Sequence, residues 1–247
     1  MSSTPTTVRA ALVTGGSGGI GRVAAERLAQ DGFAVAVQYA GNKARAEETV
    51  AAITAAGGRA LAVGGDVADE NAMTAAFDAV ESAFGGIDVV VNTAGIMILS
   101  PVATFDLADL DRMHRTNIRG TFVVSQQAAR RVRPGGAIVN ISTSVVRTQL
   151  PGYGAYVASK AAVEGLTLIL ARELRGRDVT VNAVAPGPTA TPLFLDGKDD
   201  ATVANFAKAT PLERLGGPED IAEVVSFLAG PARWVNGQVL YANGGLA

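Results

Sequence analysis

Seven short apolar runs, rich in Val and Ala, alternate along this chain with longer segments of helical periodicity. Continuous apolar strands separated by helices are typical of a parallel sheet covered on both faces, because each parallel connection needs a crossover. Right-handed crossovers then build a doubly wound α/β sheet, whose ligands bind beyond the carboxyl ends of the strands. The predicted strands lie at about residues 9–14, 33–39, 59–67, 87–95, 136–142, 179–187 and 237–245.

The segments between these strands predict the helices and the domain organisation. Helices are expected at about residues 21–32, 43–58, 69–86, 106–132 and 156–176. No repeat, linker or low-complexity tract divides the chain, so we predict one domain over residues 8–247 after a flexible tail at 1–7. Residues 188–216 interrupt the alternation with a long, mixed, Pro- and Gly-containing segment. Such a segment is either a substrate loop or lid, or a mobile surface insertion.

Composition narrows the function classes. With 48% hydrophobic and 18% charged residues, the 247-residue chain is expected to be globular. Its net charge is −2 and no basic stripe marks a nucleic-acid partner. The chain has no cysteine, and its only histidine is His114, which we interpret as structural. Thiolate, zinc–thiolate and multi-histidine metal sites and a Ser-His-Asp triad are therefore not expected.

The amino-terminal residues and the apolar runs predict the cellular location. The start of the chain lacks a basic segment followed by a long apolar run, so it does not read as a signal peptide. The apolar runs of the predicted strands are far shorter than the roughly 20 residues that cross a bilayer. A soluble cytoplasmic protein is expected.

A glycine cluster, "TGGSGGIG" at residues 14–21, follows the first predicted strand and opens the first helix. Glycines allow a tight turn and a close approach of a pyrophosphate to the backbone. The start of the helix then offers free N–H groups and its positive dipole end to phosphate. The spacing of Gly15, Gly19 and Gly21 differs from G-x-G-x-x-G, and no G-K-[ST] ending follows. Although any tight strand–helix turn could use such a cluster, its position favours a dinucleotide site.

The end of the second strand favours NADP(H) over NAD(H). An NAD enzyme usually places an acidic residue there for the ribose hydroxyls. In this chain Gln38 and Tyr39 stand at that position, and Asn42, Lys43 and Arg45 follow. Amides and cations can bind a 2′-phosphate that a carboxylate would repel. Alternatively, Lys43 and Arg45 are solvent-exposed residues of the next helix that pair with its glutamates.

Six motifs in order resemble those of the short-chain dehydrogenase/reductase family, over about residues 8–245. They are the glycine loop, Asp66-Val67, "NTAG" at residues 92–95, Asn117, the Tyr156-x-x-x-Lys160 pair and "PGPTAT" at residues 186–191. Thr93 stands where the family has a second asparagine. The resemblance implies a Rossmann-type fold with strand order 3-2-1-4-5-6-7 and no metal.

The same resemblance implies roles for individual residues. Catalysis would rest on Tyr156, Lys160 and Asn117, with Asn117 holding a water in a proton relay. The cofactor-binding set would comprise Gly15, Ser17, Gly19, Ile20, Gly21, Tyr39, Asn42, Lys43, Asp66, Val67, Asn92, Ala94, Gly95, Tyr156, Lys160, Pro186, Gly187, Thr189 and Thr191. Candidates for shaping the substrate pocket are Ser144, Tyr153, Leu193 and Phe194.

The position of the family's catalytic serine, 13 residues before the tyrosine, is occupied by Thr143. A threonine hydroxyl can also polarise a carbonyl, although its methyl group narrows the pocket. Side chains alternate along a strand, so Ser142 should point away from the surroundings of Thr143. Thr143 is therefore our fourth catalytic candidate, and Ser144 is its reserve.

Tyr156 and Lys160 lie one helical turn apart and so share a face. A free tyrosine, with a pKa of about 10, is a ready acid at pH 7, and a nearby ammonium favours its phenolate. We predict that the lysine lowers the pKa of the tyrosine, which assists proton transfer in both directions.

The motif set predicts an NADPH-dependent reductase that converts a ketone to a secondary alcohol. Within the family the chain looks most like 3-oxoacyl-(acyl-carrier-protein) reductases, which implies a 3-oxoacyl thioester or another small carbonyl compound. The alternatives are an NAD-dependent alcohol, sugar or steroid dehydrogenase and a non-catalytic dinucleotide sensor. The former would need an acid near strand two, and the latter would have lost the tyrosine or lysine.

Two kinds of protein partner are also predicted. Arginines within residues 126–136 and 171–177 are candidates for binding an acidic carrier protein. Alternatively, they are simply solvent-exposed residues at helix ends. Family members commonly pair through the long helices around strand five, so residues 106–132 and 154–175 are expected to support a homotetramer or dimer.

Overall fold

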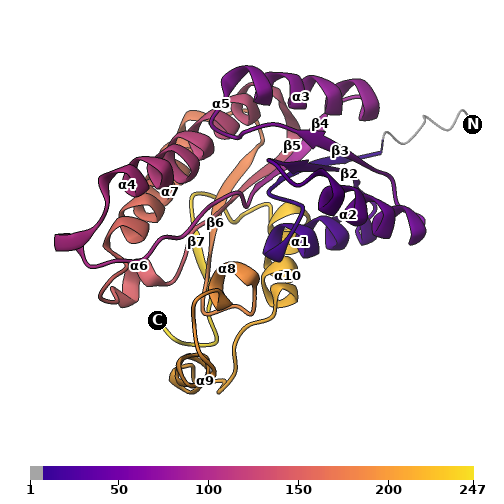
Figure 1. Cartoon of the computed structure of the whole chain (residues 1–247). Helices are drawn as coiled ribbons and strands as arrows, with labels where there is room; N and C mark the ends of the chain where they lie inside the picture. Colours follow the sequence, from indigo (N-terminus) through magenta and orange to yellow (C-terminus); the bar gives the residue numbers. More distant parts are fainter. Residues whose placement is uncertain (1–7) are drawn as a thin grey trace, which may run out of the picture.

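Seven parallel strands form a single twisted sheet at the centre of the molecule (Figure 1). The computed structural model describes residues 8–247, so the tail expected at residues 1–7 lies outside the described residues. The strand order, β3-β2-β1-β4-β5-β6-β7, confirms the predicted Rossmann-type topology. The strands are β1 (Ala10–Thr14), β2 (Ala34–Tyr39), β3 (Ala60–Gly64), β4 (Ile87–Asn92), β5 (Val132–Ile141), β6 (Thr180–Pro186) and β7 (Val239–Ala242).

Helices cover both faces of this sheet (Figure 1). The helices are α1 (Gly19–Gln30), α2 (Lys43–Ala55), α3 (Glu70–Phe84), α4 (Leu107–His114), α5 (Thr121–Arg131), α6 (Val145–Thr148), α7 (Gly154–Glu173), α8 (Pro192–Leu195), α9 (Asp200–Ala209) and α10 (Pro218–Ala229). Alternate residues of the strands divide the core in two. Val13 packs with α1, α2 and α10, whereas its neighbour Leu12 packs with α3, α5 and α7.

The sheet changes winding direction at β1, and this opens the crevice that holds the site. β1 pairs with β2 on one side and with β4 on the other, and Thr14 is in register with Asn92. The connections after β1 and β4 therefore leave toward opposite faces, and a ligand can enter between them. The motifs at residues 14–21, 92–95, 141–144 and 186–191 all follow the carboxyl ends of strands.

Several elements differ from the sequence expectations, and the helix α10 at Pro218–Ala229 was not predicted at all. The helix expected over residues 106–132 is interrupted by a π-helical turn at Arg115–Gly120, which contains Asn117. β5 begins at Val132, four residues before the predicted start. The irregular segment at residues 188–216 contains the short helices α8 and α9.

One helix, α7, has the length and hydropathy of a membrane-spanning segment. Tyr156, Lys160 and Leu170 on this helix are nevertheless buried in the protein. Helix α7 packs on the π-helical turn and on β6.

Candidate active site

The glycine loop turns from β1 into α1 in a way that other residues would not permit. Gly15 and Gly19 have positive φ values of 63° and 51°. A Cβ on Gly21 would clash with the carbonyl oxygen of Gly15 and with the hydroxyl of Thr93. Helix α1 has no side-chain cap at Gly18, so its first N–H groups can bind a phosphate, as the sequence predicts.

Gln38, at the position where an NAD enzyme carries its acid, is used inside the protein. The side chain is 1% exposed; its Oε1 accepts a hydrogen bond from the Gly15 N–H at 3.2 Å, and its Nε2 donates to the Gly65 carbonyl at 2.6 Å. It therefore positions the glycine loop against the end of β3. The amide is committed to these two partners and is not a free contact for a cofactor phosphate.

Among the predicted 2′-phosphate ligands, Arg45 is the one that reaches the cavity. Asn42 caps α2 through the Arg45 N–H at 3.0 Å, and Lys43 pairs with Glu47 at 3.3 Å. Tyr39 is half-buried at the end of β2. Arg45 lines the cavity beside the glycine loop and pairs with no carboxylate within residues 8–247.

The ends of β3 and β4 carry the predicted adenine and ribose contacts. Asp66 Oδ1 accepts a hydrogen bond from the Ala68 N–H at 2.9 Å, and its carboxylate pairs with Arg115 at 2.9 Å. Val67 is buried against Gly120. Neither Asp66 nor Val67 lines the main cavity.

Thr14 connects the tips of β1 and β4. Its hydroxyl donates to Asn92 Oδ1 at 2.9 Å and accepts from the Ala94 N–H at 3.2 Å. Thr93 donates back to the Thr14 carbonyl. Thr14 and Thr93 were absent from the predicted site; the register of β1 with β4 creates these contacts, and a motif read along the chain does not show that register.

Asn117 anchors the π-helical turn to the segment after β4. Its Oδ1 accepts from the Ile96 N–H, and its Nδ2 donates to the Ile96 carbonyl, both at 2.9 Å. Nδ2 also donates to Ser159 Oγ at 3.0 Å, and Ser159 in turn donates to the Tyr156 carbonyl. The carbonyl of Asn117 accepts the Thr121 hydroxyl at 2.7 Å. Asn117 thus joins the π-helical turn to α7 through Ser159, a residue that the sequence analysis did not name.

The three hydroxyls after β5 point in different directions. Ser142 donates to Glu164 on α7 at 2.6 Å, although it lines the same cavity as Thr143, which the expected alternation did not predict. Ser144 donates to the Ala185 carbonyl at 3.2 Å and is 1% exposed. Thr143 lines the cavity, and its hydroxyl accepts only a long hydrogen bond, 3.3 Å, from the Val145 N–H. Thr143 is therefore the hydroxyl with donor capacity left for a ligand.

Tyr156 and Lys160 line the same cavity from α7. The Lys160 ammonium donates to the Ile141 carbonyl at 2.8 Å and lies 5.9 Å from the centre of the Tyr156 ring. Burial raises the pKa of Tyr156, with a smaller contribution from Tyr153, and burial lowers the pKa of Lys160 to about 8. The predicted lowering of the Tyr156 pKa is therefore wrong for this geometry, because burial of the phenol raises its pKa.

The segment after β6 closes the cavity from the other side. Pro186 accepts the Ser144 N–H at 2.8 Å, which joins the ends of β5 and β6. A side chain at Gly187 would lie 2.8 Å from the Asn243 backbone. Thr189 and Thr191 line the cavity, and the Thr191 methyl group approaches Gly19. The predicted nicotinamide segment thus lies against the glycine loop.

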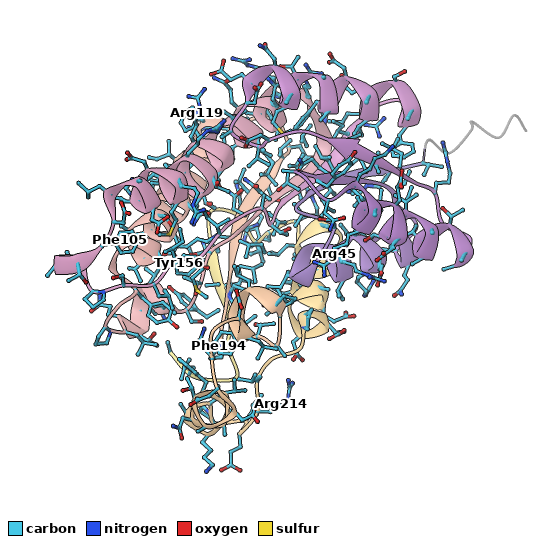
Figure 2. All side chains as sticks on the ribbon, in the orientation of Figure 1. Arg45, Phe105, Arg119, Tyr156, Phe194 and Arg214 are labelled. Carbon is cyan, nitrogen blue, oxygen red and sulfur yellow. The ribbon has the colours of Figure 1, made fainter. Side chains whose placement is uncertain are left out.

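The main cavity has a volume of about 300 Å³ and brings most of the predicted residues together. In Figure 2, Tyr156, Phe194 and Arg45 lie on three sides of the central part of the molecule. From the predicted set, the cavity is lined by Gly19, Ile20, Gly21, Gly95, Thr143, Ser144, Tyr153, Tyr156, Lys160, Pro186, Gly187, Thr189, Thr191, Leu193 and Phe194. Gly15, Ser17, Asn92, Ala94 and Asn117 do not line it. Phe206 and Leu246 line it too, although neither was among the predicted site residues.

Known proteins match this chain over nearly its whole length. A family model described as enoyl-(acyl carrier protein) reductase matches residues 15–247. A short-chain type dehydrogenase/reductase of Picea abies is 45% identical, over 96% of this chain and 92% of the relative. The chain belongs to the short-chain dehydrogenase/reductase family.

Other members of this family are almost as similar and differ in their named activities. An NADPH-dependent aldehyde reductase-like protein of Arabidopsis thaliana is 41% identical over 98% of this chain and 95% of its own length. A 3-oxoacyl-(acyl-carrier-protein) reductase of Staphylococcus aureus is 41% identical over 96% and 98%. The solved structure of a Burkholderia cenocepacia short chain dehydrogenase in complex with NADP has a TM-score of 0.91 and 41% identity, over 96% and 97%.

The site fits a dinucleotide of the kind that this oxidoreductase family uses. The cradle at Gly15, Gly19 and Gly21 leaves space that side chains would fill, beside free N–H groups at the start of α1. The guanidinium of Arg45, which pairs with no carboxylate within residues 8–247, lines the same cavity. Both features suit an anionic, phosphate-bearing group.

Proposed function

We propose that this protein is an NADPH-dependent reductase that converts a small carbonyl compound to an alcohol. The observation that carries the proposal is the convergence of Thr143, Tyr156 and Lys160 on one cavity that also contains the glycine loop. A bound nicotinamide dinucleotide supplies the hydride, and the charge that develops on the substrate oxygen then needs donors and a proton.

Thr143 and Tyr156 supply these donors. The Thr143 hydroxyl polarises the carbonyl, since among the three hydroxyls after β5 it is the one that donates to no protein acceptor. The raised pKa of Tyr156 keeps its phenol protonated through the neutral range, and a protonated phenol is the form that can donate to an alkoxide. The protonated phenol is thus the proton donor that the proposed reduction requires.

Lys160 and Asn117 keep the helix that carries Tyr156 in place. Lys160 is anchored on the Ile141 carbonyl at 2.8 Å, and Asn117 holds Ser159 at 3.0 Å, one helical turn after Tyr156. The Asn117 amide is fully engaged, so we assign it a positioning role in place of direct contact with a relay water.

Residues on both sides of the site support NADP(H) as the cofactor. We assign the 2′-phosphate to Arg45, which no carboxylate neutralises within residues 8–247. The NADP named in the Burkholderia structure and the NADPH named in the Arabidopsis relative support the same preference. The absence of an acid at Gln38 argues against the alternative of an NAD-dependent dehydrogenase.

The relatives are named for different substrates, so several classes of carbonyl compound are candidate substrates of this protein. Aldehydes and 3-oxoacyl thioesters are each represented by a relative that is 41% identical. We propose that residues 188–216 form the substrate loop of a single domain, because Leu193, Phe194 and Phe206 from this segment line the cavity. Cytoplasmic location stays a prediction, and the Arabidopsis relative is named as chloroplastic.

We further propose a homotetramer or dimer that pairs subunits through α5 and α7. These helices expose Phe122, Leu168 and Ile169 by 54%, 42% and 52%, which is apolar area that a subunit interface would cover. Light scattering of the purified protein tests this assembly, and a monomer at every concentration would contradict it.

Tyr156→Phe is the direct test of the proposed reaction. NADPH oxidation by the wild-type protein is first measured against a panel of aldehydes, ketones and acetoacetyl thioesters. Loss of the acid should then lower kcat by roughly 1,000-fold, while NADPH binding, followed by fluorescence, is retained. Tyr241→Phe, in β7 outside the main cavity, is the matched control and should keep its activity. Near wild-type turnover by Tyr156→Phe with NADPH bound would falsify the assigned chemistry.

A further inference from the structure

Apolar side chains from four separate segments form the substrate half of the main cavity. The wall residues that the argument uses are Val145, Leu150, Leu193, Phe194, Phe206 and Leu246. They come from α6 and the turn after it, from α8, from α9 and from the carboxyl-terminal segment. Of the described residues that line the cavity, only Arg45 and Lys160 are charged, and Lys160 is committed to the Ile141 carbonyl.

Two aromatic rings make the rigid part of this wall. Phe194 on α8 and Phe206 on α9 meet edge to face, with ring centroids 5.3 Å apart and an interplanar angle of 78°. The Lys198 ammonium lies 4.7 Å from the centroid of the Phe194 ring and donates to the Phe194 carbonyl at 2.6 Å. Phe194 is thus held both by Phe206 and by Lys198, and this fixes two short helices that bury no residue completely.

The charges around this wall do not suit an anionic substrate. Lys198 is bound to Phe194, and the Arg147 guanidinium lies 4.0 Å from the centroid of the Tyr241 ring. Asp196, Asp199 and Asp200 surround the connection from α8 to α9. None of these charged residues lines the cavity, so a carboxylate or phosphate held at this wall would find no cation among the residues that form it.

Two of the arginines considered for a carrier protein, Arg131 and Arg133, lie at the opposite end of β5 from the cavity. Arg131 and Arg133 flank Val132, where β5 begins, whereas Thr143 follows its end at Ile141. At about 3.3 Å per residue, a ten-residue strand separates the two ends by roughly 30 Å. Arg131 pairs with Asp78 and Glu81, and Arg133 pairs with Asp88. These arginines are therefore both distant from the cavity and already neutralised.

We propose that the substrate is a free, apolar aldehyde or ketone, and that Phe206 determines this specificity by completing the wall with Phe194. This inference rests on the carbonyl reductase function proposed above. It excludes substrates whose acyl group carries a carboxylate or whose delivery needs an acidic carrier protein.

The test compares two aldehydes that differ by one charged group. With NADPH, benzaldehyde should be reduced with a kcat/KM at least about 100-fold above that of 4-carboxybenzaldehyde, since burial of an unpaired carboxylate is strongly unfavourable. Phe206→Ala should lower kcat/KM for benzaldehyde by roughly tenfold or more, mainly through KM, because it removes apolar contact in the ground state and the transition state alike. Phe227→Ala, on α10 and 47% exposed outside the cavity, is the matched control and should change neither value.

A binding measurement separates failure of this inference from failure of the proposed reaction. Benzyl alcohol and 4-carboxybenzyl alcohol are titrated into the NADP⁺-loaded protein by calorimetry, which needs no turnover. Tighter binding of benzyl alcohol, weakened by Phe206→Ala, supports the apolar wall even if no aldehyde is reduced. Equal or tighter binding of the carboxylate, or a kcat/KM for an acetoacetyl carrier protein above that for benzaldehyde, overturns the inference while leaving the reductase intact.

Discussion

The cofactor half and the substrate half of the site are built on different principles. Around the glycine loop, the backbone itself has the shape of the ligand, and α1 buries Gly21, Ala24, Ala25 and Leu28 beneath it. On the substrate side, α8 and α9 have no completely buried residue, and α8 is four residues long. The cofactor half is therefore formed by backbone that the fold fixes. The substrate half is formed by side chains that pack on one another.

This difference separates what can change from what cannot. The cofactor half is held by the sheet, because Thr14, Asn92 and Gln38 join β1, β4 and the end of β3 with buried hydrogen bonds. In the substrate half, α8 and α9 are joined to each other by one aromatic pair and the contacts of Lys198, and each is capped by a side chain of its own, that of Thr191 or Asp199. A small substitution in the cofactor half should therefore abolish cofactor binding, whereas a small substitution in the substrate half should change only the substrate preference.

The largest effect is expected for a single methyl group in the cofactor half. Gly21→Ala places a Cβ against the Gly15 carbonyl and the Thr93 hydroxyl, which are both fixed by β1 and β4. We expect a loss of about 3 kcal/mol or more in the free energy of unfolding, and no measurable NADPH binding. Urea unfolding and NADPH fluorescence titration measure the two effects.

Gly18→Ala is the matched control within the same loop. A Cβ there meets no atom within 4 Å, and its φ of −173° is accessible to alanine. It should bind NADPH within a fewfold of the wild-type affinity. If both variants were equally damaged, the loop would need flexibility and not merely space, and the contrast between the two halves would fail.

The second prediction tests which hydroxyl acts at the boundary between the halves. Thr143→Val keeps the shape and removes the donor, so kcat should fall by roughly 100-fold, as for loss of one oxyanion donor. Thr143→Ser restores the hydroxyl and should recover activity. Ser144→Ala should have a small effect, because that hydroxyl is occupied by the Ala185 carbonyl. A larger loss from Ser144→Ala than from Thr143→Val would exchange their roles.

The sequence named Ser144, Tyr153, Leu193 and Phe194, which line the cavity on the substrate side, but it did not name Phe206, for a physical reason. Glycine spacing after a strand reports a backbone requirement, so Gly15, Gly19 and Gly21 could be named without a structure. Phe206 is 50 residues from Tyr156 and reaches the cavity only because α9 folds back over it. Contacts of that kind depend on tertiary packing, and no local pattern encodes them.

The same limit explains the misassigned roles of two polar residues. Gln38 was expected near the ribose, yet its partners Gly15 and Gly65 become neighbours only through the register of the sheet. The prediction that Lys160 lowers the pKa of Tyr156 followed from their spacing on one helix face. Spacing did not show that both side chains are buried, or that Ile141 accepts the ammonium.

The third prediction concerns how much the buried Lys160 lowers the free energy of unfolding of the cofactor-free protein. Its pKa falls from 10.5 to about 8 on folding, so below pH 8 the folded state must bury a charge that the unfolded chain keeps in water. We expect Lys160→Met to be more stable at pH 7 by about 2 kcal/mol, which is less than the full shift allows because the bond to Ile141 is lost.

The pH dependence provides the control for this prediction. The unfolded state binds the extra proton between about pH 8 and 10.5, so wild-type stability should rise toward that of the variant over this range. Urea unfolding at pH 7.0 and 9.5 measures the gap, below the range in which Tyr156 ionises. A gap that does not change with pH would show that Lys160 is not buried as an ammonium.

The smallest expected effect belongs to the exposed rim of the cofactor half, at Arg45. Arg45→Ala should lower the preference for NADPH over NADH by about tenfold, since one solvent-exposed cation is removed from a phosphate. Lys43→Ala is the matched control, because Lys43 is paired with Glu47 and should change the ratio little. Parallel kcat/KM values with both cofactors measure it, and the Arg45 effect should shrink at high salt because the contact is screened. If Lys43→Ala shifted the preference more than Arg45→Ala did, the cation at the cavity would not be the one that selects the phosphate, and even the rim of the cofactor half would rearrange on binding.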